Sequence, residues 1–107
     1  MNYNITIDNN KYIERFFNKF KMYENDIKSN IYNTLPELID FKPYKIKPAY
    51  HLKRHGLTIF EYKIVVNKNN FRAGYTINDN DITLFYITNT IIKREFVKEL
   101  ENTSLID

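Results

Sequence analysis

The part of the sequence that most constrains the fold is residues 50–90, which predict three consecutive β-strands. Residues 59–66 are rich in β-branched and aromatic side chains, residues 71–77 alternate between apolar and polar, and residues 82–89 are apolar on both faces. Short polar turns separate these strands. The pattern therefore predicts an antiparallel meander.

The segment before the meander reads differently. Pro43 and Pro48 favour an extended connection over residues 41–48 rather than an ordered element. We expect residues 50–57 to form a short extended segment that ends in a turn at Gly56.

The first ten residues predict a strand followed by a helix start. Residues 2–8 alternate between apolar and polar, as in a half-buried strand. Residues 11–24 carry aromatic and apolar side chains at a period of 3.6, which predicts an amphipathic helix. Either Asn9 or Asn10 can cap it.

A second helix is expected to start at Asn25 or Asp26 and to be interrupted at Pro36, which lacks a backbone donor. Thr34 begins a capping-box pattern, so a short further piece should run to about residue 39. The two helices should form an antiparallel hairpin on the sheet.

A last helix is expected from Ile91 or Ile92 to Glu101. The fold class is then α+β, in the order β-α-α-β-β-β-α, within one domain spanning residues 1–107. The first strand must pair with the meander, because a lone strand leaves its backbone groups unsatisfied. We expect an antiparallel twisted sheet with the helical hairpin on one face and the other face partly open.

The absence of cysteine excludes disulfides and thiolate metal sites. His51 and His55, without acidic neighbours, are too few to predict a metal site. We expect no signal peptide, because residues 1–10 lack an apolar run, and no apolar stretch approaches the roughly 20 residues that cross a bilayer. The expectation is a cytoplasmic protein without a cofactor or a membrane contact.

Positive charge is concentrated in one segment. The chain has a net charge of +3, but residues 42–75 contain eight basic residues and one acid, Glu61, which gives +7 there and −4 elsewhere. A basic block of this kind suits a polyanionic partner. The alternative is a solvated lysine-rich surface.

Strand alternation places the candidate site residues. If Tyr62 and Ile64 pack under the helices, Lys63 faces the open side, and Arg72 on the next strand does the same. Further basic residues that could complete or rim a cationic cleft are Lys53, Arg54, His55, Lys68, Lys93 and Arg94. The alternatives are ordinary surface charges, perhaps paired with Glu61, and helix pairs of Lys93 and Arg94 with Glu95 and Glu99.

The motifs that carry a family resemblance are residues 52–56 (LKRHG), 61–64 (EYKI), 71–72 (FR) with Tyr75, 82–87 (ITLFYI) and 93–94 (KR). In this order the chain resembles the RelE/ParE superfamily of bacterial and phage toxins over nearly its whole length. The resemblance implies a type II toxin that an antitoxin holds inactive. Members of the RelE and HigB type cleave mRNA in the ribosomal A site, whereas members of the ParE type poison DNA gyrase.

The resemblance also implies roles for individual residues. Lys63, Arg72 and either Lys93 or Arg94 match the family's basic site positions, while Val65 and Phe96 replace side chains that some members use. RNA cleavage by its own 2′-OH needs no metal: Arg72 would bind the phosphate, Lys93 or Arg94 would offset developing charge, and Lys63 or His55 would act as base. The alternatives are a ParE-like or catalytically inactive binding protein and a passive partner domain of a phage or mobile element.

Overall fold

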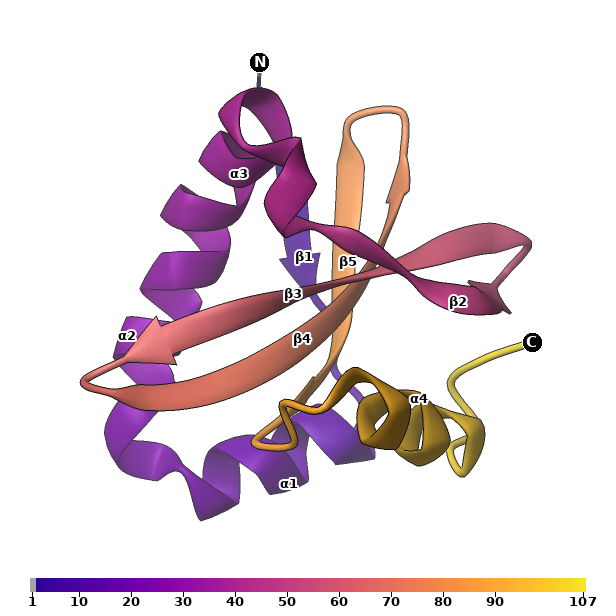
Figure 1. Ribbon diagram of the computed structural model, residues 1–107. Coiled ribbons are helices and arrows are strands. Elements are labelled where there is room, and N and C mark those ends of the chain that lie inside the picture. The colour runs from indigo at the N-terminus through magenta and orange to yellow at the C-terminus, as the bar shows by residue number, and fades with distance from the viewer. Residues whose placement is uncertain (1) are drawn as a thin grey trace.

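A computed structural model describes residues 2–107 and shows an α+β fold built on one five-stranded mixed sheet (Figure 1). The strands are β1 (Asn4–Ile7), β2 (Lys47–Arg54), β3 (Leu57–Val66), β4 (Asn69–Asn78) and β5 (Asp81–Thr88). The helical segments are α1 (Lys11–Lys19), η1 (Lys21–Tyr23), α2 (Glu24–Ser29), η2 (Asn30–Thr34), α3 (Leu35–Phe41), η3 (Pro43–Lys45) and α4 (Lys93–Glu101). Within the described residues, no helix is long and apolar enough to span a membrane.

The predicted meander is confirmed as β3, β4 and β5, which pair antiparallel in sequence order. Two expectations about the sheet were wrong. β1 pairs with β5 in parallel, so the sheet is mixed rather than antiparallel. Residues expected to form a connection and a short extended segment instead form β2, which adds a strand to the predicted order. Pro48 is tolerated there because β2 is an edge strand.

The first helix begins as predicted. The Asn10 side chain accepts hydrogen bonds from the backbone N–H groups of Tyr12 and Ile13, both at 2.9 Å. Asn10 also donates to the Phe85 carbonyl at 2.9 Å, which ties this cap to β5. The cap therefore fixes both the start of α1 and its position on the sheet.

The second helical segment departs from the prediction. It begins at Glu24 after the 3₁₀ turn η1, and it continues through the π-helical η2 to Phe41. The wider η2 turn ends two residues before Pro36, and Pro36 lies in the first turn of α3, where its missing N–H group is tolerated, so the predicted interruption at Pro36 is wrong. The Thr34 side chain makes no capping bond, so the predicted capping box is wrong.

The two helical segments do not run side by side. In Figure 1, α1 crosses the bottom of the molecule while α2 and α3 rise along its left side, so they form an angled pair rather than an antiparallel hairpin. Both pack on one face of the sheet, as expected. Their apolar side chains form a core with alternate residues of the strands, including Ile13, Phe16, Ile27, Leu35, Tyr62, Ile64 and Phe71.

The opposite face of the sheet carries a second, smaller core under α4. Phe96, Val97 and Leu100 pack there against Ile59 and Phe85. Gly74 permits this close approach, since a Cβ at that position would lie 3.4 Å from Phe96 Cζ. This is the face of the sheet that was expected to be partly open. Helix α4 covers only one part of it.

The Asn10 cap gives a test of this packing. Asn10→Ala should lower the free energy of unfolding by about 1–2 kcal/mol, because α1 loses its cap and the link to Phe85. Urea denaturation followed by circular dichroism measures the change. The matched control is Asn9→Ala at an exposed neighbouring position, which should change stability by less than about 0.5 kcal/mol. Equal effects of the two substitutions would contradict the assignment of Asn10 as the cap.

Candidate nucleic-acid interface

Lys63 and Arg72 lie directly opposite each other on neighbouring strands. The β3–β4 register pairs their Cα positions, and residues paired in this way point to the same face of the sheet. Tyr62 and Ile64, on either side of Lys63, are buried against the helices on the other face. Lys63 and Arg72 therefore share the face that α4 covers only in part, as the strand alternation predicts.

Arg72 is held by two bonds from different parts of the chain. Its Nη1 donates to the carboxylate of Glu61, which is buried, and its Nε donates to the Ile91 carbonyl at 2.9 Å. The alternative that Glu61 pairs with one of these two cations is thus correct for Arg72. A guanidinium carries five N–H groups, so donors on Nη2 lie outside these two bonds. The Arg72 side chain is 17% exposed, which keeps it accessible.

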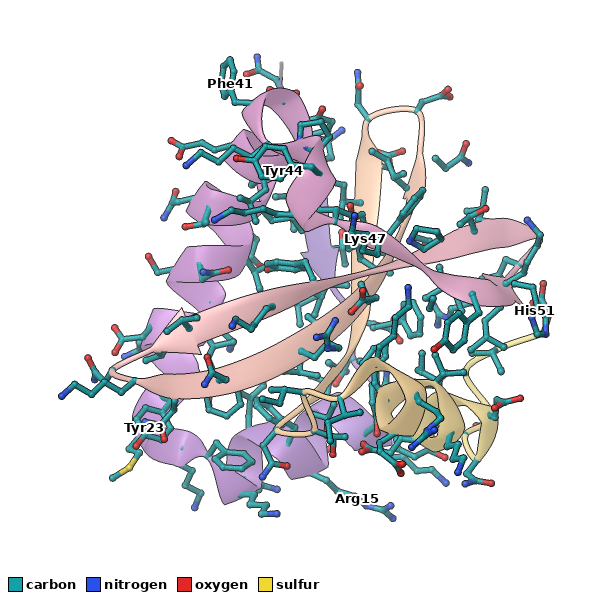
Figure 2. The ribbon with its side chains drawn as sticks, viewed as in Figure 1. Arg15, Tyr23, Phe41, Tyr44, Lys47 and His51 are labelled. Atoms are coloured by element: carbon teal, nitrogen blue, oxygen red, sulfur yellow. The ribbon has the colours of Figure 1, made fainter. Side chains whose placement is uncertain are left out.

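Lys93 and Lys47 complete a group of cations around Arg72. The bond to Ile91 fixes the link between β5 and α4, two residues before Lys93. Lys47 on β2 pairs in register with Glu61, and Figure 2 shows it where β2 crosses β3. Burial, and then the charges of Arg72 and Lys47, lower the pKa of Lys93. We call Lys47, Lys63, Arg72 and Lys93 the cationic cluster.

The structure distinguishes between the two basic residues that follow β5. Lys93 is partly exposed and lies close enough to Arg72 and Lys47 for their charges to act on it, whereas the Arg94 side chain is 75% exposed, with Nε 3.9 Å from a Glu95 oxygen. Glu99, proposed as a helix-pair partner, accepts a hydrogen bond from the Tyr86 hydroxyl at 2.8 Å. Lys93 is therefore the better candidate of the two. Phe96 is buried in the core below.

The other predicted RNA-binding residues lie at the two turns that flank β3. Lys53, Arg54 and His55 adjoin the β2–β3 turn, which is about 20 Å from Lys63 at 3.3 Å per residue. Lys68 lies in the β3–β4 turn, about 15 Å from Lys63 in the opposite direction. The structure therefore separates these residues from the cationic cluster.

Arg54 and His55 have structural contacts at their turn. Arg54 donates to the Leu105 carbonyl at 3.0 Å, lies 3.4 Å from Asp8, and stacks its guanidinium 4.6 Å from the Phe85 ring centroid. The His55 and Gly56 backbone N–H groups donate to the Asp107 carboxylate, at 2.6 and 2.8 Å. Those two bonds lower the pKa of Asp107. The contacts of Arg54 and His55 anchor the C-terminal residues against the hairpin.

Lys47 was not predicted from the sequence as a site residue. It was assigned to a connection because Pro43 and Pro48 lie on either side of it. Ala49 is in fact buried under α4, on the face that Lys47 shares. An edge strand admits proline, and the pairing of β2 with β3 places Lys47 beside Glu61.

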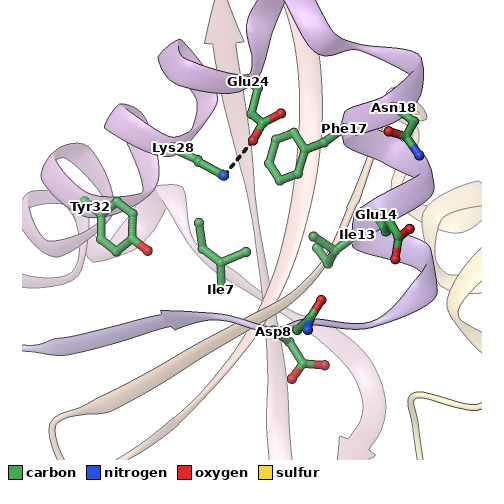
Figure 3. A pocket seen from close by; sticks show the side chains of 10 residues that line it. Ile7, Asp8, Ile13, Glu14, Phe17, Asn18, Glu24, Lys28 and Tyr32 are labelled. Atoms are coloured by element: carbon green, nitrogen blue, oxygen red, sulfur yellow. Dashed lines mark hydrogen bonds and ion pairs between the residues drawn. The ribbon is translucent and has the colours of Figure 1, made fainter.

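A surface pocket elsewhere has the wrong charge for a polyanion. It has a volume of about 460 Å³ and lies between α1, α2 and β1 (Figure 3). Three carboxylates line it, from Asp8, Glu14 and Glu24, and its lysine, Lys28, is bonded to Glu24 at 2.6 Å. Among residues 2–107, no group of three or more His, Cys, Asp or Glu side chains could hold a metal ion.

Removing Arg72 should destabilise the protein, because the Glu61 carboxylate would then be buried without a partner. Arg72→Met should lower the free energy of unfolding by about 3 kcal/mol at pH 7, because Glu61 loses its partner. The double variant Glu61→Leu with Arg72→Met should recover most of the loss, since apolar side chains can replace a buried pair.

Urea denaturation at pH 7 measures these differences. The control is Lys63→Met, an exposed neighbour on the same face, which should change stability by less than about 0.5 kcal/mol. An Arg72→Met variant as stable as the control, or a double variant less stable than Arg72→Met, would show that the pair does not act as described.

Comparison with known proteins found no relative of this chain. No protein-family model, no curated protein and no solved structure matches the chain. A function is therefore inferred from the chemistry of the cationic cluster and from the motifs that surround it.

Proposed function

We propose that the chain is a toxin of the RelE/HigB type, a ribosome-dependent endoribonuclease that cleaves mRNA without a metal ion. The observation that carries this proposal is the convergence of four cations, from β2, β3, β4 and the start of α4, on one partly open face of the sheet. Phosphodiester binding requires such convergence, because an isolated surface lysine binds phosphate weakly. The motif order in the sequence supports the same family.

In the proposed reaction, the cluster binds the scissile phosphate and moves two protons. Arg72 binds the non-bridging oxygens through the N–H groups that are not bonded to Glu61 or Ile91, and Lys47 adds positive charge. In the deprotonated fraction of Lys93, the amine takes the proton of the 2′-OH, and the 2′ oxygen attacks phosphorus. The bond from phosphorus to the 5′ oxygen breaks, and the Lys63 ammonium protonates that oxygen. The products are a 2′,3′-cyclic phosphate and a 5′-hydroxyl end.

This assignment changes the base inferred from sequence. Lys63 is exposed, whereas burial and two neighbouring cations lower the pKa of Lys93, which raises the fraction of Lys93 that is neutral. His55 lies at the far turn with its backbone bonded to Asp107. General base action by a positioned side chain contributes about 10²–10⁴-fold to a rate.

The proposed partners follow from the same surface. The substrate is mRNA on the ribosome. The cognate antitoxin is expected to place an acidic, partly helical segment over the cationic cluster, where it would neutralise the charge that binds RNA. The cytoplasm is the compartment where all these partners meet.

A second candidate is a ParE-like protein that binds gyrase or another protein without cleaving RNA. The Glu61–Arg72 pair favours it, because the buried carboxylate offsets part of the Arg72 charge. In this case the cluster would contribute electrostatic attraction to a partner and no chemistry.

Primer extension on mRNA from a translation extract tests the first proposal. The wild-type chain should produce discrete cuts that require ribosomes. Lys93→Ala should reduce cutting by about 10²–10⁴-fold, because the base is lost. The double variant Glu61→Leu with Arg72→Met should reduce it by about 10²–10³-fold through loss of transition-state charge stabilisation.

The charge-matched control is Lys21→Ala, which removes an exposed lysine from η1 and should leave cutting unchanged. Intact mRNA together with inhibition of gyrase supercoiling would favour the second candidate. Cuts that persist in both cluster variants would contradict the assignment of the site.

A further inference from the structure

Tyr50 adopts a backbone conformation that is rare for a residue with a side chain. Its φ is +50°, in the left-handed region where a Cβ is disfavoured. The other non-glycine residues with positive φ, His55, Asn67, Lys68 and Asp79, lie in or beside tight turns of the hairpins. Tyr50 instead lies inside β2, where a regular strand would give an unstrained φ.

A large bulge in β2 imposes this conformation. Between the pairs Pro48–Phe60 and Lys53–Thr58, β2 advances five residues while β3 advances two. The extra residues include Tyr50 and His51. Bulges re-aim side chains and are frequent beside functional sites. A bulky residue held at positive φ points to a constraint of the same kind.

The bulge places the Tyr50 ring next to the cationic cluster and leaves it open to solvent. The Lys93 Nζ lies 4.9 Å from the ring centroid, in a cation–π contact. The residue nevertheless stays 52% exposed, whereas most large aromatic residues of the strands are buried in the two cores. An exposed ring beside a group of cations is the combination that binds single-stranded nucleic acid, by stacking on a base while the cations hold the adjacent phosphates.

We propose that Tyr50 is a nucleobase-stacking residue of this site, so that the site takes an unpaired nucleotide whose base lies on the ring while its phosphate lies on Arg72, next to Lys93. The inference rests on the proposed function, since it assumes that the cluster binds RNA phosphates. Bases within an RNA duplex are stacked on one another and do not offer a face to the ring. The site therefore discriminates single-stranded RNA from duplex RNA.

The test compares two probes that carry the same phosphates. One is a short single-stranded 2′-O-methyl oligonucleotide, which cannot be cleaved, and the other is an abasic oligomer of equal length. Tyr50→Leu should weaken binding of the base-containing strand by about 5- to 150-fold, the range for loss of one stacked base, and leave binding of the abasic oligomer unchanged. Tyr50→Phe should preserve both affinities.

The matched control is Tyr32→Leu, which removes a tyrosine of similar exposure, 48%, from η2. It should change neither affinity. A Tyr50→Leu variant that binds both probes as the wild type does, or that loses affinity equally for both, overturns the stacking role alone. A wild-type chain that binds neither probe at low salt overturns the phosphate site and with it the proposed function.

A stability comparison tests the strain separately. At positive φ, glycine is preferred over alanine, so Tyr50→Gly should melt about 4–8 °C above Tyr50→Ala. Both variants lack the ring and should bind the base-containing strand as weakly as Tyr50→Leu. Equal melting temperatures would show that the bulge does not hold residue 50 in a strained conformation, and would remove the argument for a functional constraint there.

Discussion

The register of β3 against β4 is the constraint on which the rest of the molecule depends. Side chains alternate between faces along a strand, so one register sends Tyr62 and Ile64 into the helical core and leaves Lys63 and Arg72 on the other face. A slip of one residue would bury the cations against the helices and expose the aromatic residues. The apolar core therefore enforces the arrangement of charges, and the candidate site is a consequence of how the sheet packs.

The buried pair of Glu61 and Arg72 links this sheet to its C-terminal helix. Burying two charges costs several kcal/mol per ion before their attraction is counted, and an apolar pair could fill the same space. What an apolar pair would lack is the direction that the ion pair gives to the guanidinium. With Glu61 on one side and the Ile91 carbonyl on the other, Arg72 is fixed between β3 and the chain leading to Lys93. We infer that the pair pre-organises the cationic cluster for a phosphate.

The parts of the fold that follow from local pattern could be predicted, and those that depend on distant contacts could not. Alternation placed Lys63 and Arg72 on one face, and side-chain chemistry limited the first cap to Asn9 or Asn10, of which the structure shows Asn10. Strand β2 was missed because Pro48 and a bulge hide its alternation, and its partner β3 is what reveals it. The contacts of Arg54 with the C-terminal residues could not be foreseen, since nothing near it in sequence indicates them.

The salt dependence of RNA binding tests the central claim most directly, because neutralising phosphates releases counterions in proportion to the contacts made. For a single-stranded 2′-O-methyl oligonucleotide, the slope of log affinity against log salt should fall in magnitude by about 0.7 in Lys63→Ala and again by about 0.7 in Lys93→Ala. Lys21→Ala should leave the slope as it is in the wild type. Slopes that do not change in the two cluster variants, or that change equally in Lys21→Ala, would contradict a phosphate site at the cationic cluster.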